Sequence, residues 1–497
     1  MEKKNNKGSV PFLGVLAAIC FAFLVCFIPT GYAQTPASNV EKETKTRQYM
    51  ELLNSVFSFV LQNYVDETDP SVLYEGALKG MMDSLEDPYT TYLDYSQMRS
   101  LTDTTQGNFG GVGLSITKAV DSTPEKPAYV EVASPIEDTP GWKAGIQTGD
   151  LIITIDGEST AEITMDDVLT KLRGEIGKPV ELGMRRKNAD FTVTLVRALI
   201  EVPTVKYGML TEKGRKTGYL RIIEFTPQTP ERVQNALDSF VKAGFDSLVI
   251  DLRNNPGGLI TSVADVADKF IDKGIIVSTK SRLKYENSVF QATPKNTTMP
   301  KNIPIVVLIN RGSASGSEIL SGALKDYHLA YLVGERTYGK GSVQQVVPLP
   351  NSDGIKLTMA RYYTPSDTNI DKIGIPPDYE VLFPALSEEE EQTYVTLMTS
   401  TVISDYVGAH PNMTNADITA YAETLSKEYP LEGRVLRRLV RLEIDKYQNG
   451  ILYDLDFDLQ LNAALDLLNK KDFFEMVKAG KTLKELQAEV DIEEEEK

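Results

Sequence analysis

A fully apolar run at residues 303–309, IPIVVLI, leads through a turn of small residues into a helical pattern at 317–327. Its short length and its content of isoleucine and valine are typical of a buried strand. The same order of apolar strand, glycine turn and helix recurs at 247–271. Short turns that connect strands to helices predict an α/β domain over residues 203–385.

Two further patterns in this section agree with that prediction. Residues 217–225, TGYLRIIEF, form a predicted strand, and residues 229–245 form a predicted helix. Thr229 is the expected N-cap of this helix, with Pro230 in its first turn and Gly244 at its end.

Residues 107–200 follow another pattern, with short strands separated by glycine, proline and aspartate turns. One helix interrupts them, and Thr164 is its expected N-cap. Asp167 completes a capping box there, and Gly174 follows the last turn. These patterns predict a compact, mostly antiparallel domain of roughly ninety residues. The expected strands lie within 109–116, 128–135, 149–158, 179–186 and 190–197.

Helical patterns flank both predicted domains. Within 41–106, apolar residues follow helical spacing at 49–65 and 72–85. Two short amphipathic helices bury little surface alone, so we expect them to pack against the rest of the protein or against a second subunit. Residues 386–497 read as mostly helical and acidic, and no chemistry is recognisable there.

The N-terminal segment, residues 1–33, combines lysines, an apolar run and small residues. This order fits a secretory signal cleaved after Ala33, and the apolar run at 10–28 is also long enough for an uncleaved membrane anchor. Both interpretations stay open, and both predict export to the periplasm or cell envelope. Cys20 and Cys26 lie in this segment, so the exported part has no disulfide, thiol nucleophile or thiolate metal site.

The formal net charge of −18 argues against nucleic acid and anionic membrane surfaces as partners. A zinc site would have to combine the two histidines, His328 and His410, with carboxylates across a long sequence distance. We therefore expect no metal centre.

The turn after the apolar strand carries Ser313, Ser315 and Ser317 at alternate positions. Ser315 and Glu318 fit a capping box, for which a purely structural role is common. A serine at a strand-to-helix turn is also well placed as a nucleophile. The next backbone N–H, that of Gly316, has no intrahelical partner and can stabilise an oxyanion.

A nucleophilic serine needs a base. His328 lies about three turns along the same predicted helix, and His410 lies outside the α/β section, so neither suits this role. A lysine can replace histidine where burial lowers its pKa. Lys340 stands in a glycine turn between Gly339 and Gly341, for which a flexible surface loop is the alternative interpretation.

The sequence does not support three other functional patterns. The stretch GERTYGK fits the start of a phosphate-binding loop, but Gly341 follows instead of serine or threonine, and the next residues read as a strand. The stretch GGVGLSI has Ile116 where a dinucleotide fingerprint has its third glycine. Asp251 and Asp326 could be a glycosidase pair, but nothing in the sequence fixes their separation.

Several motifs together resemble one family, the carboxyl-terminal processing peptidases or tail-specific proteases. They are SASGSEI, Lys340 twenty-five positions after Ser315 within GERTYGKGSVQ, and DLRNNPGG at 251–258. FGGVGLSI and AGIQTGDLIITIDG resemble the PDZ domain of this family, and the resemblance covers about residues 45–385. It implies a multidomain α+β and α/β fold. Its parts are a mixed α/β serine peptidase core of ClpP/crotonase type, an inserted PDZ-like β domain, and helical N- and C-terminal regions.

The resemblance also implies roles for single residues. Ser315 would be the nucleophile, Lys340 the general base and Gln344 the residue that orients the amine. Ser313 and Ser317 match flanking positions and are expected to be structural.

Backbone groups would form the oxyanion hole. The N–H of Gly316 would act together with that of Gly257 or Gly258. The family usually has alanine where Gly316 stands, and this difference keeps the N–H.

The PDZ-like domain would supply selectivity. The N–H groups of Val112, Gly113 and Leu114 can bind a chain-terminal carboxylate, and the adjoining strand can pair with an extended peptide. Apolar tail residues would rest against the helix at 164–173. Arg173 would contact the active site from this domain, and a plain surface arginine is the alternative.

The sequence thus predicts an exported serine endopeptidase that binds free, largely apolar C-termini of protein substrates and cuts upstream with a Ser-Lys dyad. No metal or organic cofactor is implied. The alternative from another class is a non-catalytic PDZ scaffold that binds protein C-termini. Further partner hypotheses are an activating adaptor, a homo-oligomer formed through the terminal helices, and membrane attachment by the N-terminal segment.

Overall fold

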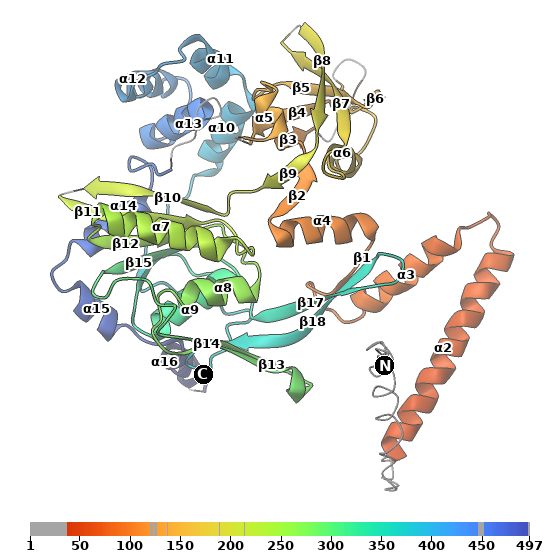
Figure 1. Cartoon of the computed structure of the whole chain (residues 1–497). Helices are drawn as coiled ribbons and strands as arrows, with labels where there is room; N and C mark the ends of the chain where they lie inside the picture. The colour runs from red at the N-terminus through yellow and green to blue at the C-terminus, as the bar shows by residue number, and fades with distance from the viewer. Residues whose placement is uncertain are drawn as a thin grey trace, which may run out of the picture. The chain divides into compact units, whose positions relative to one another are not determined.

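The computed structural model describes residues 37–495, with gaps at 120–122, 124–126, 137, 188, 213 and 446–451 (Figure 1). The predicted signal or anchor segment at 1–33 lies outside the described residues. None of the helices in the described part is both long and apolar enough to cross a bilayer. The chain divides into two compact units, Met1–Gly80 and Met81–Lys497.

The first unit, where it is described, consists of α2 (Ala37–Asn63) and most of α3 (Pro70–Asp83), as the helical spacing predicts. One stripe of α2 is apolar and exposed, and along it Leu52 is 60% and Phe59 66% exposed. Isolated helices are only marginally stable in water, so this stripe has the character of an interaction surface. Its members are Tyr49, Leu52, Leu53, Val56 and Phe59.

A six-stranded sheet forms the core of the second unit, in the order β10-β11-β12-β15-β16-β19. The pair β10 and β11 is antiparallel, and the other neighbours are parallel. The strands predicted within 217–225, 247–253 and 303–309 are confirmed as β11, β12 and β15. The bounds are β10 Val205–Glu212, β11 Arg215–Ile222, β12 Ser247–Asp251, β15 Ile305–Ile309, β16 Tyr331–Gly334 and β19 Tyr379–Glu380.

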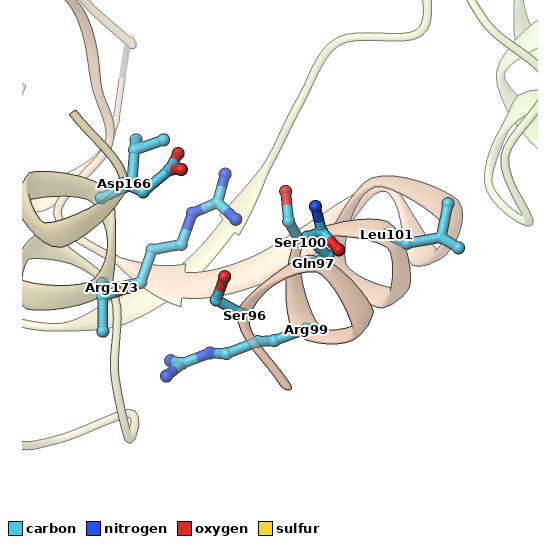
Figure 2. A pocket seen from close by; sticks show the side chains of 9 residues that line it. Ser96, Gln97, Arg99, Ser100, Leu101, Asp166 and Arg173 are labelled. Carbon is cyan, nitrogen blue, oxygen red and sulfur yellow. The ribbon is translucent and has the colours of Figure 1, made fainter. Parts of the chain in front are cut away.

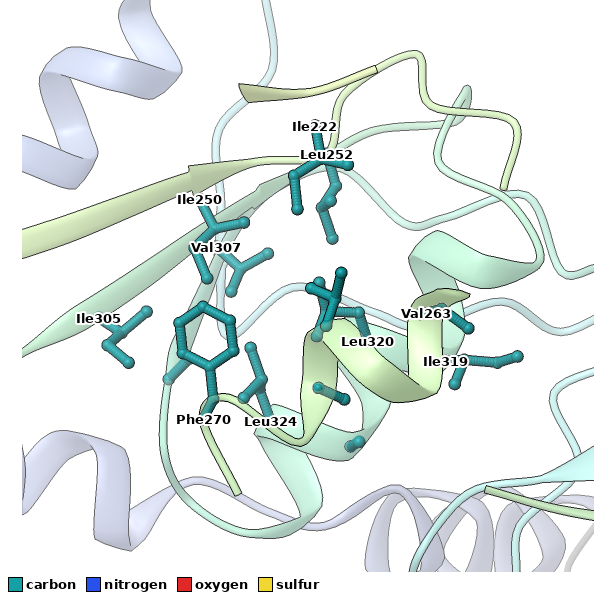
Figure 3. Close-up of a cluster of buried hydrophobic side chains, with 14 of the residues drawn as sticks. Ile222, Ile250, Leu252, Val263, Phe270, Ile305, Val307, Ile319, Leu320 and Leu324 are labelled. Atoms are coloured by element: carbon teal, nitrogen blue, oxygen red, sulfur yellow. The ribbon is translucent and has the colours of Figure 1, made fainter. Parts of the chain in front are cut away.

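Both faces of this sheet are covered, because successive side chains of a strand point to opposite faces. Ile250 and Val307 belong to the cluster that includes α7, α8 and α9 (Figure 3). Val306 and Leu308 belong to a second cluster with α14 and α15. Burial on two faces explains the continuous apolar runs. The helices are α7 Thr229–Ala243, α8 Ile260–Ala267, α9 Gly316–Asp326, α14 Leu459–Leu468 and α15 Phe473–Ala479.

The start of α7 differs from the prediction. Gln228, and not Thr229, occupies the N-cap position. Thr229 is fully buried, and its hydroxyl donates to the carbonyl of Glu224 at 2.8 Å, so it fixes the preceding loop instead. The predicted end is confirmed, because Gly244 adopts the left-handed conformation with φ 68°.

A second sheet is antiparallel, and the sequence patterns predict only one of its strands. This strand follows Lys340 and is β17 (Ser342–Pro348). β18 pairs with β17, with β13 and with the short β1, which lies in a section predicted to be helical. The remaining bounds are β1 Thr91–Leu93, β13 Gly274–Ser281, β14 Ser288–Ala292 and β18 Gly354–Tyr363.

The PDZ-like section forms an antiparallel sheet in the order β3-β4-β5-β7-β8 around its own apolar core. Helix α6 (Met165–Leu172) has the predicted capping box of Thr164 and Asp167. Outside this sheet, β2 (Asn108–Gly111) pairs with β9 (Ala198–Glu201) and follows α4 (Tyr95–Gln106). The sheet strands are β3 Leu114–Lys118, β4 Val130–Pro135, β5 Leu151–Ile155, β7 Pro179–Arg186 and β8 Ala189–Val196, and β6 (Glu158–Ser159) pairs with β5.

The C-terminal region is helical, as predicted. Four helices pack around an apolar cluster of their own, and α16 (Leu483–Glu495) contributes Leu483 to the core beside α9. The four are α10 Glu388–Thr399, α11 Val402–Ala409, α12 Asn415–Leu425 and α13 Gly433–Asp445.

Candidate active site

The turn between β15 and α9 holds Ser315 in a strained backbone conformation. Its φ is 52° and its ψ is −110°, a region that L-residues rarely occupy. Ser315 is partly exposed, whereas its two neighbours in the alternating pattern are fully buried. The hydroxyl of Ser313 donates to Leu252 O at 2.8 Å, and that of Ser317 donates to Asn255 O at 2.9 Å. Of the three serines, Ser315 is therefore the one that the turn presents to a cavity.

The backbone of the Lys340 turn is held by hydrogen bonds on both sides. The N–H of Lys340 donates to Glu318 Oε2 at 2.9 Å, and its carbonyl accepts a hydrogen bond from the Tyr362 hydroxyl. The N–H of Gly341 donates to Asp371 Oδ1 at 3.0 Å. A Cβ on Gly341 would lie 2.6 Å from the backbone nitrogen of Asp371, so the close approach requires glycine. This turn is fixed to the core rather than being a flexible surface loop.

The groups around Lys340 shift the pKa of its amine in opposite directions. Burial, and after it the positive charge of Lys356, lower the pKa of Lys340 below its ordinary value. The carboxylates of Asp87 and Glu318 oppose this shift without cancelling it. A lysine with a lowered pKa is more often neutral near pH 7 and can then accept a proton.

Glu318 joins the serine turn to the lysine turn. Its carboxylate accepts the N–H of Ser315 at 2.8 Å, which is half of the predicted capping box. It also accepts the hydroxyl of Thr337 at 2.5 Å and the N–H groups of Gly339 and Lys340 at 2.8 and 2.9 Å. Burial raises the pKa of Glu318, and these hydrogen bonds act against that rise. The sequence indicated only the cap, because the other three partners lie about twenty positions further along the chain.

The oxyanion candidates lie close to the serine. A Cβ on Gly257 would lie 2.8 Å from both Ser315 Cβ and the nitrogen of Gly316, so this loop packs directly on the serine turn. The N–H of Gly257 donates to Asn255 Oδ1 at 2.8 Å. Gly258 lines the cavity at Ser315 and Gly257 does not. Gly258 is therefore better placed than Gly257 to act with Gly316.

One cavity of 330 Å³ brings the predicted residues together. Ser315, Lys340, Gln344 and Gly258 all line it. The side-chain amide of Gln344 donates to Ser342 Oγ at 2.9 Å and to Thr358 Oγ1 at 3.1 Å. Most other lining residues are apolar: Leu101, Phe225, Pro256, Leu259, Ile260, Ile319, Val343 and Val346.

The predicted peptide-binding loop of the PDZ-like domain lies at a sheet edge. Val112 is buried, Gly113 has a φ of 74°, and Leu114 begins β3, the edge strand. A Cβ on Gly113 would lie 2.2 Å from Thr139 Cβ, so only glycine fits this turn. An edge strand offers unpaired backbone groups to an added peptide strand.

Arg173 lies between the PDZ-like domain and α4. Its guanidinium lies 4.5 Å from the centroid of the Phe109 ring. It lines a cavity of 470 Å³ in which Arg173, which follows α6, and Asp166 of α6 face Ser96 and other residues of α4 (Figure 2). Leu101 of α4 lines this cavity and also the cavity at Ser315. One helix therefore borders both candidate sites.

Comparisons with known proteins identify the family. The model of Peptidase family S41 matches residues 216–381, that of the activating protease CtpB N-terminal domain matches 24–97, and that of the PDZ domain matches 131–186. The chain is 39% identical over 371 residues to the carboxy-terminal-processing protease of Bartonella bacilliformis, which covers 73% of this chain and 82% of that protein. This chain belongs to the carboxy-terminal processing protease family. It is a serine-type peptidase with a PDZ domain, as the motifs predicted.

Two further proteins of this kind are similar over most of the chain. The carboxy-terminal processing protease CtpB of Bacillus subtilis is 31% identical over 354 residues, covering 71% of this chain and 72% of that protein. Among solved structures, the photosystem II D1 C-terminal processing protease is 31% identical, with a TM-score of 0.41, and covers 66% of this chain and 92% of that one.

The histidines and aspartates that the alternative catalytic interpretations require do not line the cavity at Ser315. His328 follows the far end of α9, and His410 ends α11 with Nδ1 2.8 Å from the carbonyl of Tyr406. Asp251 forms an ion pair with Arg253 at 2.6 Å, and Asp326 accepts backbone N–H groups. The strand β17 stands where a phosphate-binding loop would need a helix.

Proposed function

We propose that Ser315 is the nucleophile and Lys340 the general base of an exported endopeptidase that recognises free, largely apolar C-termini. The observation that carries the proposal is the carboxylate of Glu318, which accepts a backbone N–H from both residues, and both residues line one cavity. A binding scaffold has no use for a strained serine and a lysine with a lowered pKa joined in this way. The family membership of the chain supports the same conclusion.

The proposed reaction is acyl transfer. The neutral amine of Lys340 takes the proton of the Ser315 hydroxyl as Oγ attacks the scissile carbonyl carbon. The N–H groups of Gly316 and Gly258 stabilise the oxygen that becomes negative. The ammonium of Lys340 then protonates the leaving amine, and a water activated by the same amine hydrolyses the serine ester. Gln344 lines the cavity beside Lys340 and would orient its amine.

The PDZ-like domain supplies substrate selection in this proposal. The terminal carboxylate would bind at Val112, Gly113 and Leu114, and the tail would add a strand to β3. Arg173 would transmit occupancy toward Ser315, since α4 borders both cavities. An activating adaptor would act on the same link.

The setting of the enzyme is also part of the proposal. The pattern at residues 1–33 supports export to the periplasm or cell envelope, with or without cleavage of the segment. The apolar stripe of α2 supports a homo-oligomer. No metal or organic cofactor takes part in the proposed reaction.

One experiment tests the proposal. Residues 34–497 and the Ser315→Ala variant are incubated with an unstructured protein that ends in an apolar tail, either free or amidated. We expect the parent alone to cleave it, faster when the tail carboxylate is free, with products identified by mass spectrometry. Tail binding by both proteins without cleavage by the parent would instead support a scaffold or an enzyme that needs its activator.

A further inference from the structure

We propose that Tyr89 is a positioning residue for the reaction, because its ring covers the amine of Lys340 and separates that amine from solvent. This proposal rests on the proposed function of Lys340 as general base. Tyr89 precedes β1, in a section of the chain that sequence motifs did not connect with the active site. The centroid of its ring lies 4.8 Å from Lys340 Nζ.

The position of Tyr89 is fixed by its neighbours. Asp87 accepts the N–H of Tyr89 at 3.1 Å and the hydroxyl of Thr90 at 2.6 Å. Thr90 in turn accepts the N–H of Thr358 at 3.1 Å. The following strand, β1, pairs with β18, where Thr91 lies opposite Lys356. Tyr89 is therefore attached to the same sheet that carries the partners of Gln344.

The ring of Tyr89 has two separable effects on the amine. A cation within about 6 Å of an aromatic ring is attracted to its face, which favours the protonated amine. The bulk of the ring also excludes water, which favours the neutral amine. Burial, and after it the hydroxyl of Tyr338, raise the pKa of Tyr89 itself, so the phenol stays neutral where the enzyme would work.

Other charged groups lie near the pair, among them Glu224, which lines the same cavity as Lys340. Lys356 on β18 disfavours the protonated amine of Lys340, while Asp87 and Glu318 favour it. Asp371 acts on Tyr89 from the loop that follows β18. None of these groups is altered when the side chain at position 89 is changed, so variants there report on the ring.

Three variants separate the two effects. Tyr89→Phe keeps the face and the bulk, Tyr89→Leu keeps much of the bulk without the face, and Tyr89→Ala removes both. The readout is the rate at which a fluorophosphonate probe labels the serine, measured across pH, because labelling rises as Lys340 loses its proton. We expect the Phe variant to keep the parent midpoint. The Leu variant should move it down by about half a pH unit.

The Ala variant should move in the opposite direction. Water admitted beside Lys340 restores the ammonium, so the midpoint rises and labelling at pH 7 falls about tenfold for each unit of the rise. Tyr285→Leu and Tyr285→Ala, at a tyrosine that is 82% exposed, are matched controls and should leave the profile unchanged. Thermal melting of each variant verifies that it is folded, and the Phe and Leu variants carry the test if the Ala variant does not fold.

Two results overturn the proposal in distinguishable ways. Unchanged profiles in the folded Leu and Ala variants, or shifts in the same direction, overturn the role of Tyr89 while Lys340→Met still abolishes the pH-dependent labelling. If Lys340→Met keeps the parent profile, the proposed function fails, and the role of Tyr89 fails with it.

Discussion

Lys340 is a basic residue in an environment that disfavours its charged form. Its amine is half-buried beside another lysine, and its backbone is held by Glu318, Tyr362 and the glycine turn. The lowered pKa means that the unfolded chain binds more protons than the folded chain between the folded pKa and about 10.5. In that window the free energy of unfolding rises with pH, so the lysine destabilises the fold most at neutral pH.

Lys340→Met should therefore separate activity from stability. We expect loss of cleavage and an increase in melting temperature of about 2 °C at pH 7, because an apolar side chain replaces a buried charge. The gain should shrink as the pH approaches 10.5, and thermal unfolding at several pH values measures it. Lys301→Met, at an exposed lysine, is the matched control. A variant that is less stable than the parent at pH 7 would contradict this account.

Glu318 gives the second prediction at this scale. Glu318→Gln keeps the shape but replaces one acceptor oxygen with an NH₂ group that faces N–H donors. We expect a loss of about 1–3 kcal/mol in the free energy of unfolding, because buried donors lose their partners. Probe labelling of Ser315 should slow by at least about tenfold, since both turns shift, an effect of about 1.4 kcal/mol on the barrier. Chemical denaturation and labelling kinetics measure the two effects, and Glu475→Gln on the surface of α15 is the control.

Among the elements, the loop from β12 to α8 packs on the serine turn at Gly257 and on Phe225 at Gly258. A Cβ on Gly258 would lie 2.2 Å from the carbonyl oxygen of Phe225, and φ there is 138°. Gly258→Ala should therefore displace the loop and reduce kcat by about a hundredfold, with KM less affected, because a lost oxyanion donor acts in the transition state. Steady-state kinetics on the tailed substrate test this. Gly214→Ala, where a Cβ meets nothing within 4 Å although φ is also positive, controls for backbone strain alone.

Sequence patterns predicted the elements whose signals are local. The capping box of α6, the glycine end of α7 and the strand-to-helix turn at Ser315 all depend on residues within a few positions of one another. In the second sheet, β1 and β13 each pair with β18 across a long sequence distance, and local patterns do not reveal such pairings. Thr90 and Thr358, for example, are 268 positions apart. The roles of Glu318 and Tyr89 escaped prediction for the same reason, since each depends on partners that only the folded chain brings together.

At the scale of the whole molecule, the C-terminal helices are part of the enzyme core. The guanidinium of Arg253 lies 2.6 Å from Asp251 on β12 and 2.6 Å from Asp458 at the start of α14. Arg253 lies in the same short segment after β12 that carries Gly257 and Gly258. The acidic composition after residue 386 did not reveal this connection, because its evidence is a contact across 205 positions.

Asp458→Asn should weaken this connection. Arg253 keeps Asp251 but loses a charged partner in a mostly buried site, so we expect a loss of about 2 kcal/mol in the free energy of unfolding. If α14 supports the oxyanion loop, cleavage of the tailed substrate should slow more than probe labelling of Ser315. Chemical denaturation and kinetics measure both, with Asp472→Asn on an exposed site as control. Unchanged stability would mean that α14 docks without this ion pair.

The apolar stripe of α2 bears on how many copies of the chain associate. Apolar side chains recur at spacings of three and four from Tyr49 to Phe59 and stay exposed, which a monomer of this length has no reason to maintain. We predict that residues 34–497 form a homodimer through this stripe, and that Leu52→Glu with Phe59→Glu converts it to a monomer. Asn54→Glu with Ser58→Glu, which adds the same charge at exposed positions on the opposite face of α2, should leave the dimer intact. Light scattering over a range of protein concentrations distinguishes these outcomes, and a parent that stays monomeric at every concentration would refute the interface.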